Sequence, residues 1–554
     1  MNREFDVLVV GAGPSGSACA LHLARNGVNV IILETGRVPG EKNASGGIVY
    51  GSDVGGFGLK RLVPDFETTA PLERKISSHE VHILSAPDEG KGTYRYYTLS
   101  RKSLASRFGL FSVEFETGHD YTILRSQFDS WLANLAVEAG AALSTETTAL
   151  DLLKEDDGSV IGVSTTKGEL RAKLVVDCSG VTSTLVESAG LRGALVPRQL
   201  YHGIKHVYRL GSDKIEERLR LRAGEGRALT YLGEFMLGIN GNAFIYPNRD
   251  TLSLGIVASM DSMIRATTEH FDRVGKLLDA LDAFRGHPMV RELLQGAELL
   301  EFSAHNIPKG FTCLLKRPYT SGYLAAGDAL GAFVKIGPMV DGMRYAIASG
   351  MMAAQTYLAA AVSGSFREKN LSRYRDLLTP VYEDVNRSGR DSFISESGFV
   401  YRTLPRLLFG SKLLSHKVEI KAEDGSRKRV RHGTDAVTYV EDGGYSQIDV
   451  NVELASRSVT KPWIPSCPAN CFTLTTPGGS VSSFRDLFRQ NLDAIGGGHK
   501  RKALGQTMRQ VAESKLSFDP MGCVECGACR AIGPKDTIGF RYESRGRGVS
   551  YSFG

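Results

Sequence analysis

The first forty residues alternate between apolar runs and a small-residue stretch. Residues 4–10 are mostly apolar, which is typical of a strand buried on both faces of a parallel sheet. A glycine-rich turn leads into a helix of small residues over 17–25, and a second apolar strand covers 28–33. This order of strand, helix and strand predicts a βαβ unit and therefore an α/β fold.

The same patterns recur further along the chain. Apolar residues at helical spacing predict a helix over 127–138, and short apolar runs predict buried strands over 174–176 and 322–326. A long helix is expected over 342–361. Residues 200–310 alternate strand-like and helix-like segments, so we expect a second domain there.

Composition narrows the class of protein. The chain has 554 residues, of which 42% are hydrophobic and 23% charged, and this excludes wholesale disorder. The net charge of +6 comes from 67 basic and 61 acidic residues, so a nucleic-acid partner is not expected. The longest apolar stretch, 346–362, is interrupted by polar residues, so no transmembrane helix is predicted. The acidic N-terminal residues do not suggest a secretory signal.

The glycine-rich turn matches the GxGxxG pattern of dinucleotide-binding proteins. Gly11 would allow the tight turn, Gly13 would let the backbone approach a pyrophosphate, and Gly16 would let the helix pack on the strand. Glu34 ends the second strand, where a carboxylate accepts hydrogen bonds from ribose hydroxyls. The alternative is a glycine-rich turn in an unrelated α/β fold. The full turn is Gly11, Ala12, Gly13, Pro14, Ser15 and Gly16.

A second pattern favours FAD over NAD. Gly327 and Asp328 follow a late apolar strand and precede a helix. In flavoproteins of the two-dinucleotide-domain type, an Asp at this place binds a hydroxyl of the ribityl chain. Alone, Gly-Asp would be an ordinary turn, but its pairing with the GxGxxG turn favours FAD.

The chain resembles electron-transfer-flavoprotein:quinone oxidoreductases, specifically their FixC-type branch within the geranylgeranyl-reductase-like flavoproteins. The resemblance covers roughly residues 4–415 and rests on the stretches 42–47, 124–132, 327–343 and 346–350. It implies that Arg125 contacts the FAD phosphates, although Arg125 could instead only anchor its helix. It also implies that further residues bind or lie along the cofactor, although the loop 45–47 among them could be a surface turn. These residues are Ser45, Gly46, Gly47, Gly180, Gly337, Pro338 and Met339.

Five of the eight cysteines fall in the last 90 residues. Cys523, Cys526 and Cys529 form a CxxCxxC run that suits one face of a [4Fe–4S] cluster. Cys467, followed by Pro, fits the fourth ligand that ferredoxins take from a distant segment. We therefore predict one [4Fe–4S] cluster. A four-cysteine zinc site is the alternative, and Cys471 is not counted as a ligand.

The C-terminal part resembles FixX-type ferredoxin-like proteins through residues 467–469, 522–530 and 546–554. It departs from them by an insertion at about 474–517, which carries seven basic and three acidic residues. The whole chain therefore resembles a fusion of a FixC-like and a FixX-like half.

The expected fold class is α/β: a Rossmann-like FAD-binding fold of the two-dinucleotide-domain type, a mixed-sheet substrate or quinone domain, and a C-terminal α+β ferredoxin-like domain. The expected boundaries are 1–435 for the interleaved FAD-binding and quinone-binding domains, with FAD parts at about 1–75, 115–190 and 310–365, and 436–554 for the ferredoxin-like domain.

The resemblance implies an oxidoreductase that passes electrons from a two-subunit electron-transfer flavoprotein through [4Fe–4S] and FAD to ubiquinone or menaquinone. It leaves open whether the protein works within an electron-bifurcating complex. No paired carboxylates or Ser/His/Asp arrangement stands out, so no catalytic acid or base is predicted. The alternatives are an isoprenoid lipid reductase of the geranylgeranyl type and a non-catalytic electron carrier.

A quinone acceptor implies contact with a membrane. Residues 401–421 mix leucines with Arg and Lys, a combination that suits monotopic attachment to an anionic surface. An amphipathic helix packed on the domain core is the equal alternative. The basic stretch 427–431 would add lipid attraction or serve as a linker. We therefore expect a peripheral protein at the cytoplasmic face of the cell membrane.

Overall fold

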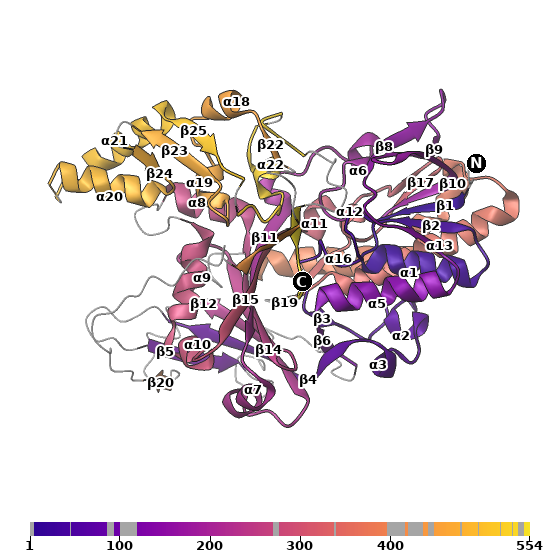
Figure 1. Ribbon diagram of the computed structural model, residues 1–554, viewed down its shortest axis with the longest axis horizontal. Helices are drawn as coiled ribbons and strands as arrows, with labels where there is room; N and C mark the ends of the chain where they lie inside the picture. The colour runs from indigo at the N-terminus through magenta and orange to yellow at the C-terminus, as the bar shows by residue number, and fades with distance from the viewer. Residues whose placement is uncertain are drawn as a thin grey trace.

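The computed structural model describes residues 5–44, 46–85, 94–99, 119–269, 276–336, 339–395, 416–418, 436–440, 448–476, 479–496, 498–520, 522–534, 536–540 and 548–554. These residues form an eight-stranded sheet, a ten-stranded sheet and a C-terminal part with smaller sheets. Figure 1 shows the first sheet at the right, the second below the centre and the C-terminal part, in yellow, at the upper left.

The first sheet is parallel at its centre and carries the βαβ unit. Its path runs β16-β17-β10-β1-β2-β7, with β8 and β9 attached to β10, and the pairs from β17 to β7 are parallel. The strand interiors are apolar because both faces are buried, which confirms the predicted α/β fold. The strands are β1 (Phe5–Val10), β2 (Val30–Leu33), β7 (Ala142–Ser144), β8 (Ala149–Lys154), β9 (Val160–Thr165), β10 (Gly168–Asp177), β16 (Tyr319–Thr320) and β17 (Tyr323–Ala325).

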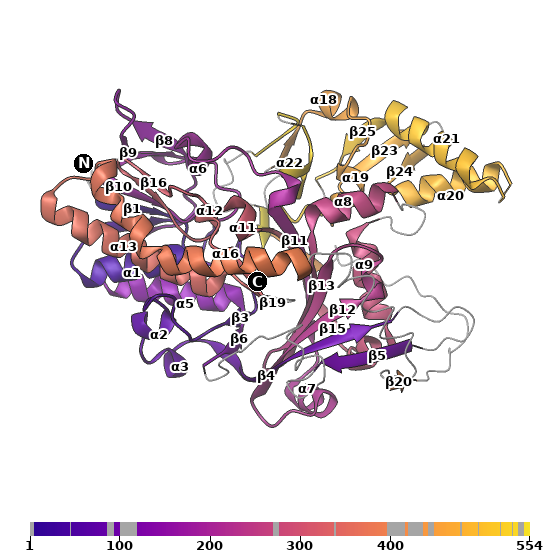
Figure 2. The same cartoon turned by 180° about the vertical axis from the view of Figure 1, so that it is seen from behind.

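Three long helices pack beside this sheet. Helix α1 (Pro14–Arg25) packs against both α5 (Arg125–Glu138) and α13 (Met343–Ser363), as Figure 2 shows from behind. Gly350 allows α13 to approach α1 closely, because a Cβ atom there would lie 2.1 Å from the Ser15 carbonyl oxygen. Helix α16 (Thr379–Ser395) follows α13 in the chain.

The second sheet draws its strands from distant parts of the chain. Its path runs β15-β11-β14-β13-β12-β4-β5-β20, and β6 pairs with both β3 and β4. The strands are β3 (Ile48–Val49), β4 (Leu72–Leu84), β5 (Tyr94–Leu99), β6 (Tyr121–Ile123), β11 (Leu200–Arg209), β12 (Glu225–Gly233), β13 (Gly241–Pro247), β14 (Thr251–Ser259), β15 (Glu298–Pro308) and β20 (His416–Val418). The associated helices are α7 (Ser212–Leu219), α8 (Met260–Glu269), α9 (Leu277–Gly286) and α10 (Pro288–Leu293).

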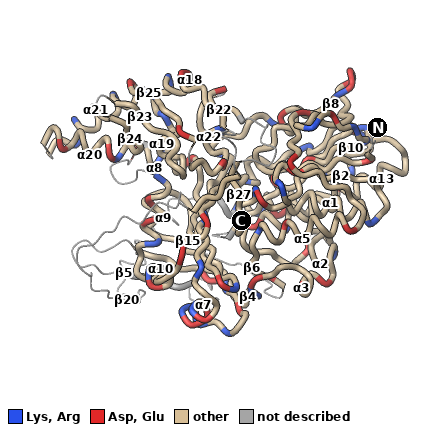
Figure 3. Tube along the Cα trace, viewed as in Figure 1, with Lys and Arg blue, Asp and Glu red and all other residues tan. Residues whose placement is uncertain are grey.

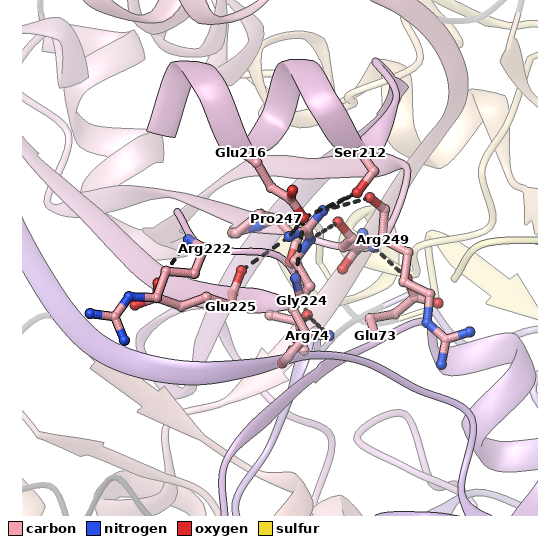
Figure 4. A network of polar contacts seen from close by, with 11 residues as sticks. Glu73, Arg74, Ser212, Glu216, Arg222, Gly224, Glu225, Pro247 and Arg249 are labelled. Atoms are coloured by element: carbon pink, nitrogen blue, oxygen red, sulfur yellow. Dashed lines mark hydrogen bonds and ion pairs between the residues drawn. The ribbon is translucent and has the colours of Figure 1, made fainter. Parts of the chain in front are cut away.

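A buried arginine ties β4 to the elements around it (Figure 4). The Arg74 guanidinium donates hydrogen bonds to Glu216 and Ser212 of α7 at 2.8 Å each. It also donates to the backbone carbonyl oxygens of Glu225, Asn248 and Arg249 at 2.6–3.2 Å. Because Arg74 is only 1% exposed, these acceptors replace the water that its charge loses on folding.

The C-terminal part packs on the second sheet through one continuous apolar cluster that includes Met260, Phe284, Trp463 and Phe472. The expected insertion folds as a hairpin of β23 and β24, two helices, and β25, which pairs back onto β23. The elements are α18 (Val452–Ser456), α19 (Trp463–Ser466), α20 (Phe484–Ala494), α21 (Lys500–Glu513), α22 (Ala528–Ile532), β21 (Thr438–Val440), β22 (Ile448–Val450), β23 (Phe472–Thr476), β24 (Gly479–Val481), β25 (Lys515–Phe518), β26 (Ile538–Phe540) and β27 (Gly548–Ser550).

Several helix starts differ from those expected. Helix α1 begins three residues early, because Pro14 suits the first helical position. Helix α5 begins at Arg125 itself. The stretch 401–421 lies outside the described residues except for β20, and 427–431 lies wholly outside them. Of the helices that the structure describes, none combines the length and apolarity needed to cross a bilayer. Acidic and basic residues are interspersed along the described trace (Figure 3).

Candidate cofactor sites

A cavity of about 400 Å³ opens where the parallel strands of the first sheet end and the second sheet begins. This volume lies in the range of small-molecule and cofactor sites. The predicted cofactor residues that line it are Gly11, Gly13, Pro14, Ser15, Glu34, Gly46, Gly47, Arg125, Gly180, Gly327 and Asp328. Ser45, Gly337 and Pro338 lie outside the described residues, and Met339 begins the short strand β19 (Met339–Asp341).

The glycine turn has the geometry expected of its sequence. Gly11 adopts a φ of +98°, which is accessible to glycine at little cost. A Cβ atom on Gly16 would lie 1.9 Å from the Gly11 carbonyl oxygen, so only glycine lets α1 pack this closely. Gly13 faces open space, since a Cβ atom there would meet only the Asn43 amide at 3.6 Å.

Glu34 lies directly after β2 and stabilises the glycine-rich turn that contains Ala12. Its carboxylate accepts hydrogen bonds from the N–H of Ala12 at 3.0 Å and from that of Gly36 at 2.7 Å. Burial raises the pKa of Glu34, and these two hydrogen bonds oppose the shift. The same side chain borders the cavity.

Arg125 is the first residue of α5 and lines the cavity. Its guanidinium donates two hydrogen bonds to Asp129, one turn later, at 2.9 and 2.7 Å. The anchoring contact considered for Arg125 is therefore present. Because Arg125 also borders the cavity, its charge lies beside any ligand bound there.

Asp328 belongs to the short helix α12 (Gly327–Leu330). Gly327 has a φ of +61°, and its N–H donates to the Ser349 hydroxyl at 2.9 Å. No described residue donates a hydrogen bond to the Asp328 carboxylate. Burial raises the pKa of Asp328 to about 6, and the charge of Arg125 opposes this shift. A ligand with hydroxyl groups would satisfy this carboxylate.

The Gly46–Gly47 loop closes the cavity against the second sheet. A Cβ atom on Gly46 would lie 3.2 Å from the Met343 sulfur, and one on Gly47 would lie 2.9 Å from the Tyr246 ring. The second sheet contributes Phe244, Tyr246, Lys205 and His305 to the same cavity. The sequence pattern did not single out these four residues.

Five thiols line a second cavity in the C-terminal part, together with apolar side chains such as Trp463 and Phe472. In the described part of the chain, no three His, Cys, Asp or Glu side chains gather closely enough for a single metal ion. The Cys471 N–H donates to the Cys467 sulfur at 3.3 Å. Cys471 was not expected at this site, since its spacing matches no ligand motif. The five are Cys467, Cys471, Cys523, Cys526 and Cys529.

The loop that carries three of these thiols is shaped by left-handed residues. Glu525 and Gly527 have φ values of +52° and +72°, which turn the chain between successive cysteines. The Trp463 indole N–H donates to the Cys529 carbonyl oxygen at 3.0 Å, and the Tyr439 hydroxyl donates to that of Cys523 at 3.0 Å.

The two cavities share a wall. Val524, between two of the cysteines, lines both the thiol cavity and the larger cavity. The Tyr551 hydroxyl donates to the Val524 carbonyl oxygen at 3.0 Å, and Tyr551 itself lines the larger cavity.

Residues 548–554, called here the bridging segment, connect these walls to the first half of the chain. Lys42 donates to the Val549 carbonyl oxygen at 2.6 Å. The N–H groups of Ser552 and Phe553 both donate to the Glu301 carboxylate, at 2.7 and 2.9 Å. The bridging segment therefore contacts Lys42, which precedes the Gly46–Gly47 loop, Glu301 of the second sheet and Val524 of the thiol loop.

Comparison with known proteins gives three kinds of match. The family model described as FAD dependent oxidoreductase matches residues 6–195. The protein FixC of Escherichia coli (strain K12) is 32% identical over 431 residues, which cover 77% of this chain and 94% of FixC. The "Probable electron transfer flavoprotein-quinone oxidoreductase YgcN" of the same organism is 36% identical over 361 residues, covering 65% of this chain and 78% of that protein.

Among solved structures, a geranylgeranyl bacteriochlorophyll reductase-like protein from Thermoplasma acidophilum matches with a TM-score of 0.52. It is 21% identical and covers 71% of this chain and 87% of that one. At this identity the match shows a shared fold. Together with the family model, it confirms the predicted α/β fold of an FAD-dependent oxidoreductase.

Proposed function

Since the chain belongs to the family of FixC and the electron-transfer-flavoprotein-quinone-oxidoreductase-like flavoproteins, we propose that it oxidises a two-subunit electron-transfer flavoprotein and reduces a membrane quinone. The chain is an FAD-dependent oxidoreductase of electron transfer, which supports this proposal. The electrons would pass through one [4Fe–4S] cluster and one FAD. The acceptor would be ubiquinone or menaquinone.

One observation carries the proposal: Val524 lines both the FAD cavity and the thiol cavity. A flavin exchanges electrons in pairs or singly, whereas an iron–sulfur cluster exchanges one at a time. Placing the two groups on either side of one residue would let a one-electron donor feed a two-electron acceptor.

The residues around the larger cavity fit FAD. Gly13 and the start of α1 offer an open backbone to a pyrophosphate, and Glu34 borders the place for a ribose. The Asp328 carboxylate accepts no hydrogen bond from the described part of the chain and would accept one from the ribityl chain. When bound, FAD would supply hydride and electron transfer, while these residues hold and orient it.

The donor set of the second cavity fits an iron–sulfur cluster. Thiols among apolar side chains are the ligands and surroundings that such clusters take. We propose Cys467, Cys523, Cys526 and Cys529 as the four ligands. Cys471 lies close enough to Cys467 that a test must separate the two.

Metal and flavin analysis of the purified chain tests the cofactors. One FAD and about four irons per chain are expected for one [4Fe–4S] cluster. Cys467→Ser should lose the iron and keep the flavin, while Cys471→Ser should keep both. Cys313→Ser, a buried cysteine that does not line the thiol cavity, is the matched control. Zinc in place of iron would contradict the cluster.

A turnover assay tests the reaction. Reduced electron-transfer flavoprotein should reduce a soluble quinone analogue only when the chain is present. Saturation of double bonds in an isoprenoid lipid would instead support a geranylgeranyl-type reductase. Activity with neither acceptor would leave a non-catalytic electron carrier, and would overturn the proposal.

We propose peripheral attachment at the cytoplasmic face of the cell membrane, through residues 401–421. The full chain should sediment with anionic vesicles, and replacing the leucines of this stretch by Ser should leave it in the supernatant.

Work within a bifurcating complex would require a second, low-potential acceptor to be reduced in the turnover assay.

A further inference from the structure

Strand β11 places one lysine on the sheet face that borders the FAD cavity. Lys205 lies opposite Gly255 of β14 and Ser303 of β15. Gly203, two residues earlier and therefore on the same face, lies opposite Val257 and His305. Lys205, Gly203 and His305 all line the cavity.

The Lys205 ammonium has no partner among the described residues. The residue is 6% exposed, and no described residue accepts a hydrogen bond from its Nζ atom or forms an ion pair with it. Glu301 and Arg125 are the charged groups that act on it, with opposite signs. The Glu301 carboxylate already accepts two N–H groups of the bridging segment.

A buried ammonium without a partner is costly, so the protein must gain from it in another state. Burial lowers the pKa of Lys205 to about 8, which leaves it mostly protonated at neutral pH. The charge is therefore present in the cavity and available to a bound group.

The surroundings of Lys205 suit a flat ring. Phe244 lies over Gly255, since a Cβ atom on that glycine would be 2.6 Å from the Phe244 ring. Gly203 leaves a smooth patch, because a Cβ atom there would meet nothing closer than 3.5 Å. The Gly46–Gly47 loop forms another wall of the same cavity.

We propose that Lys205 is the cation that stabilises the negative charge which the FAD ring system takes up on reduction. Two electrons from the donor and one proton from water convert the neutral oxidised ring into the anionic reduced ring. An ammonium in the cavity stabilises the anion relative to the neutral ring and raises the reduction potential. The inference rests on FAD binding and does not depend on the identity of the donor or the quinone.

The test compares charge removal with charge retention in the full chain loaded with its cofactors. Lys205→Met and Lys205→Gln remove the ammonium, and Lys205→Arg keeps a cation. Lys173→Met removes an exposed lysine, 55% accessible and paired with Asp6, and is the matched control. The probe is sulfite, whose lone pair forms a bond to the oxidised flavin ring and leaves the ring with the electron pair.

Sulfite affinity, followed by bleaching of the flavin absorption, should fall at least about tenfold in Lys205→Met and Lys205→Gln. The two-electron midpoint potential of the flavin should fall by at least about 30 mV, the equivalent of that tenfold change. Lys205→Arg and Lys173→Met should remain within about threefold of the unmodified chain. Unchanged sulfite affinity in Lys205→Met would overturn the proposal.

Stability of the flavin-free protein separates this role from a structural one. Because no described residue pairs with the ammonium, Lys205→Met should leave the Tm of the flavin-free chain equal or higher. A lower Tm would show that Lys205 supports the fold instead, and would also overturn the proposal. Neither readout requires turnover with a donor or a quinone, so the outcome is independent of the proposed reaction.

Discussion

The Glu301 carboxylate of β15 holds the bridging segment on the second sheet. Its Oε2 atom accepts the N–H groups of Ser552 at 2.7 Å and of Phe553 at 2.9 Å. Because the residue is only 4% exposed, water does not compete for these bonds. We expect Glu301→Gln to loosen the bridging segment while leaving the sheet intact.

The size of this effect follows from the two bonds. A hydrogen bond to a charged acceptor contributes about 1.5–3 kcal/mol and one to a neutral acceptor about 0.5–1.5 kcal/mol. Replacing the carboxylate by an amide therefore costs about 1 kcal/mol per bond and about 2 kcal/mol in all. That amounts to a roughly 30-fold shift in the local opening equilibrium of the segment.

Hydrogen exchange of the peptide that spans 548–554, measured at one pH, tests this expectation. Exchange in Glu301→Gln should be about 30-fold faster than in the unmodified chain if opening is at equilibrium. Glu298→Gln is the control, because Glu298 is on the same strand but 65% exposed and paired with Arg209. Unchanged exchange in Glu301→Gln, or equal acceleration in both variants, would refute the reasoning.

Three further predictions concern stability and cofactor retention. Arg74→Met should lower the free energy of unfolding by roughly 3–5 kcal/mol in urea titrations, since it leaves buried acceptors unpaired, whereas Arg209→Met at an exposed pair should cost less than about 1 kcal/mol. Burial raises the pKa of Asp328 to about 6, so its contribution to the stability of the flavin-free chain is present below pH about 4 and is lost as the pH rises through 6. The Tm of flavin-free Asp328→Asn should therefore match the unmodified chain at low pH and exceed it above pH 6; equal values at every pH would contradict this. Gly16→Ala should abolish FAD content, because its Cβ atom would lie 1.9 Å from the Gly11 oxygen, whereas Gly193→Ala, with open space around it, should retain the flavin.

The first βαβ unit could be predicted from the sequence because its contacts are local. Gly11 and Gly16 are five residues apart, and their roles follow from the turn itself. The helix starts were less accurate, since Pro14 and Arg125 begin helices whose apolar pattern only becomes visible later. Asp328 could also be located beside the cavity, because it follows the end of the buried strand β17 by three residues.

The meeting of the two cavities could not be predicted, because it depends on contacts between distant residues. Glu301 and Ser552 are 251 positions apart, and Lys42 and Val549 are 507 apart. Lys205 could not be singled out from the sequence for a related reason: whether a lysine in a strand faces solvent or a cavity depends on which elements cover the sheet. Cys471 lies four residues after Cys467, but the sequence does not show that both thiols line one cavity.

The contacts between the flavin half and the C-terminal part include partly exposed ion pairs, such as Arg530 with Glu187 at 3.3 Å and Arg485 with Asp279 at 2.9 Å. Such pairs contribute at most about 1 kcal/mol each, so the buried apolar cluster and the Glu301 hydrogen bonds, not the ion pairs, hold the C-terminal part in place. Covalent connection adds to these contacts, since a tether gives its ends an effective concentration in the millimolar range. Docking therefore does not depend on the protein concentration, and every molecule is synthesised with both halves in a one-to-one ratio, whatever the level of expression.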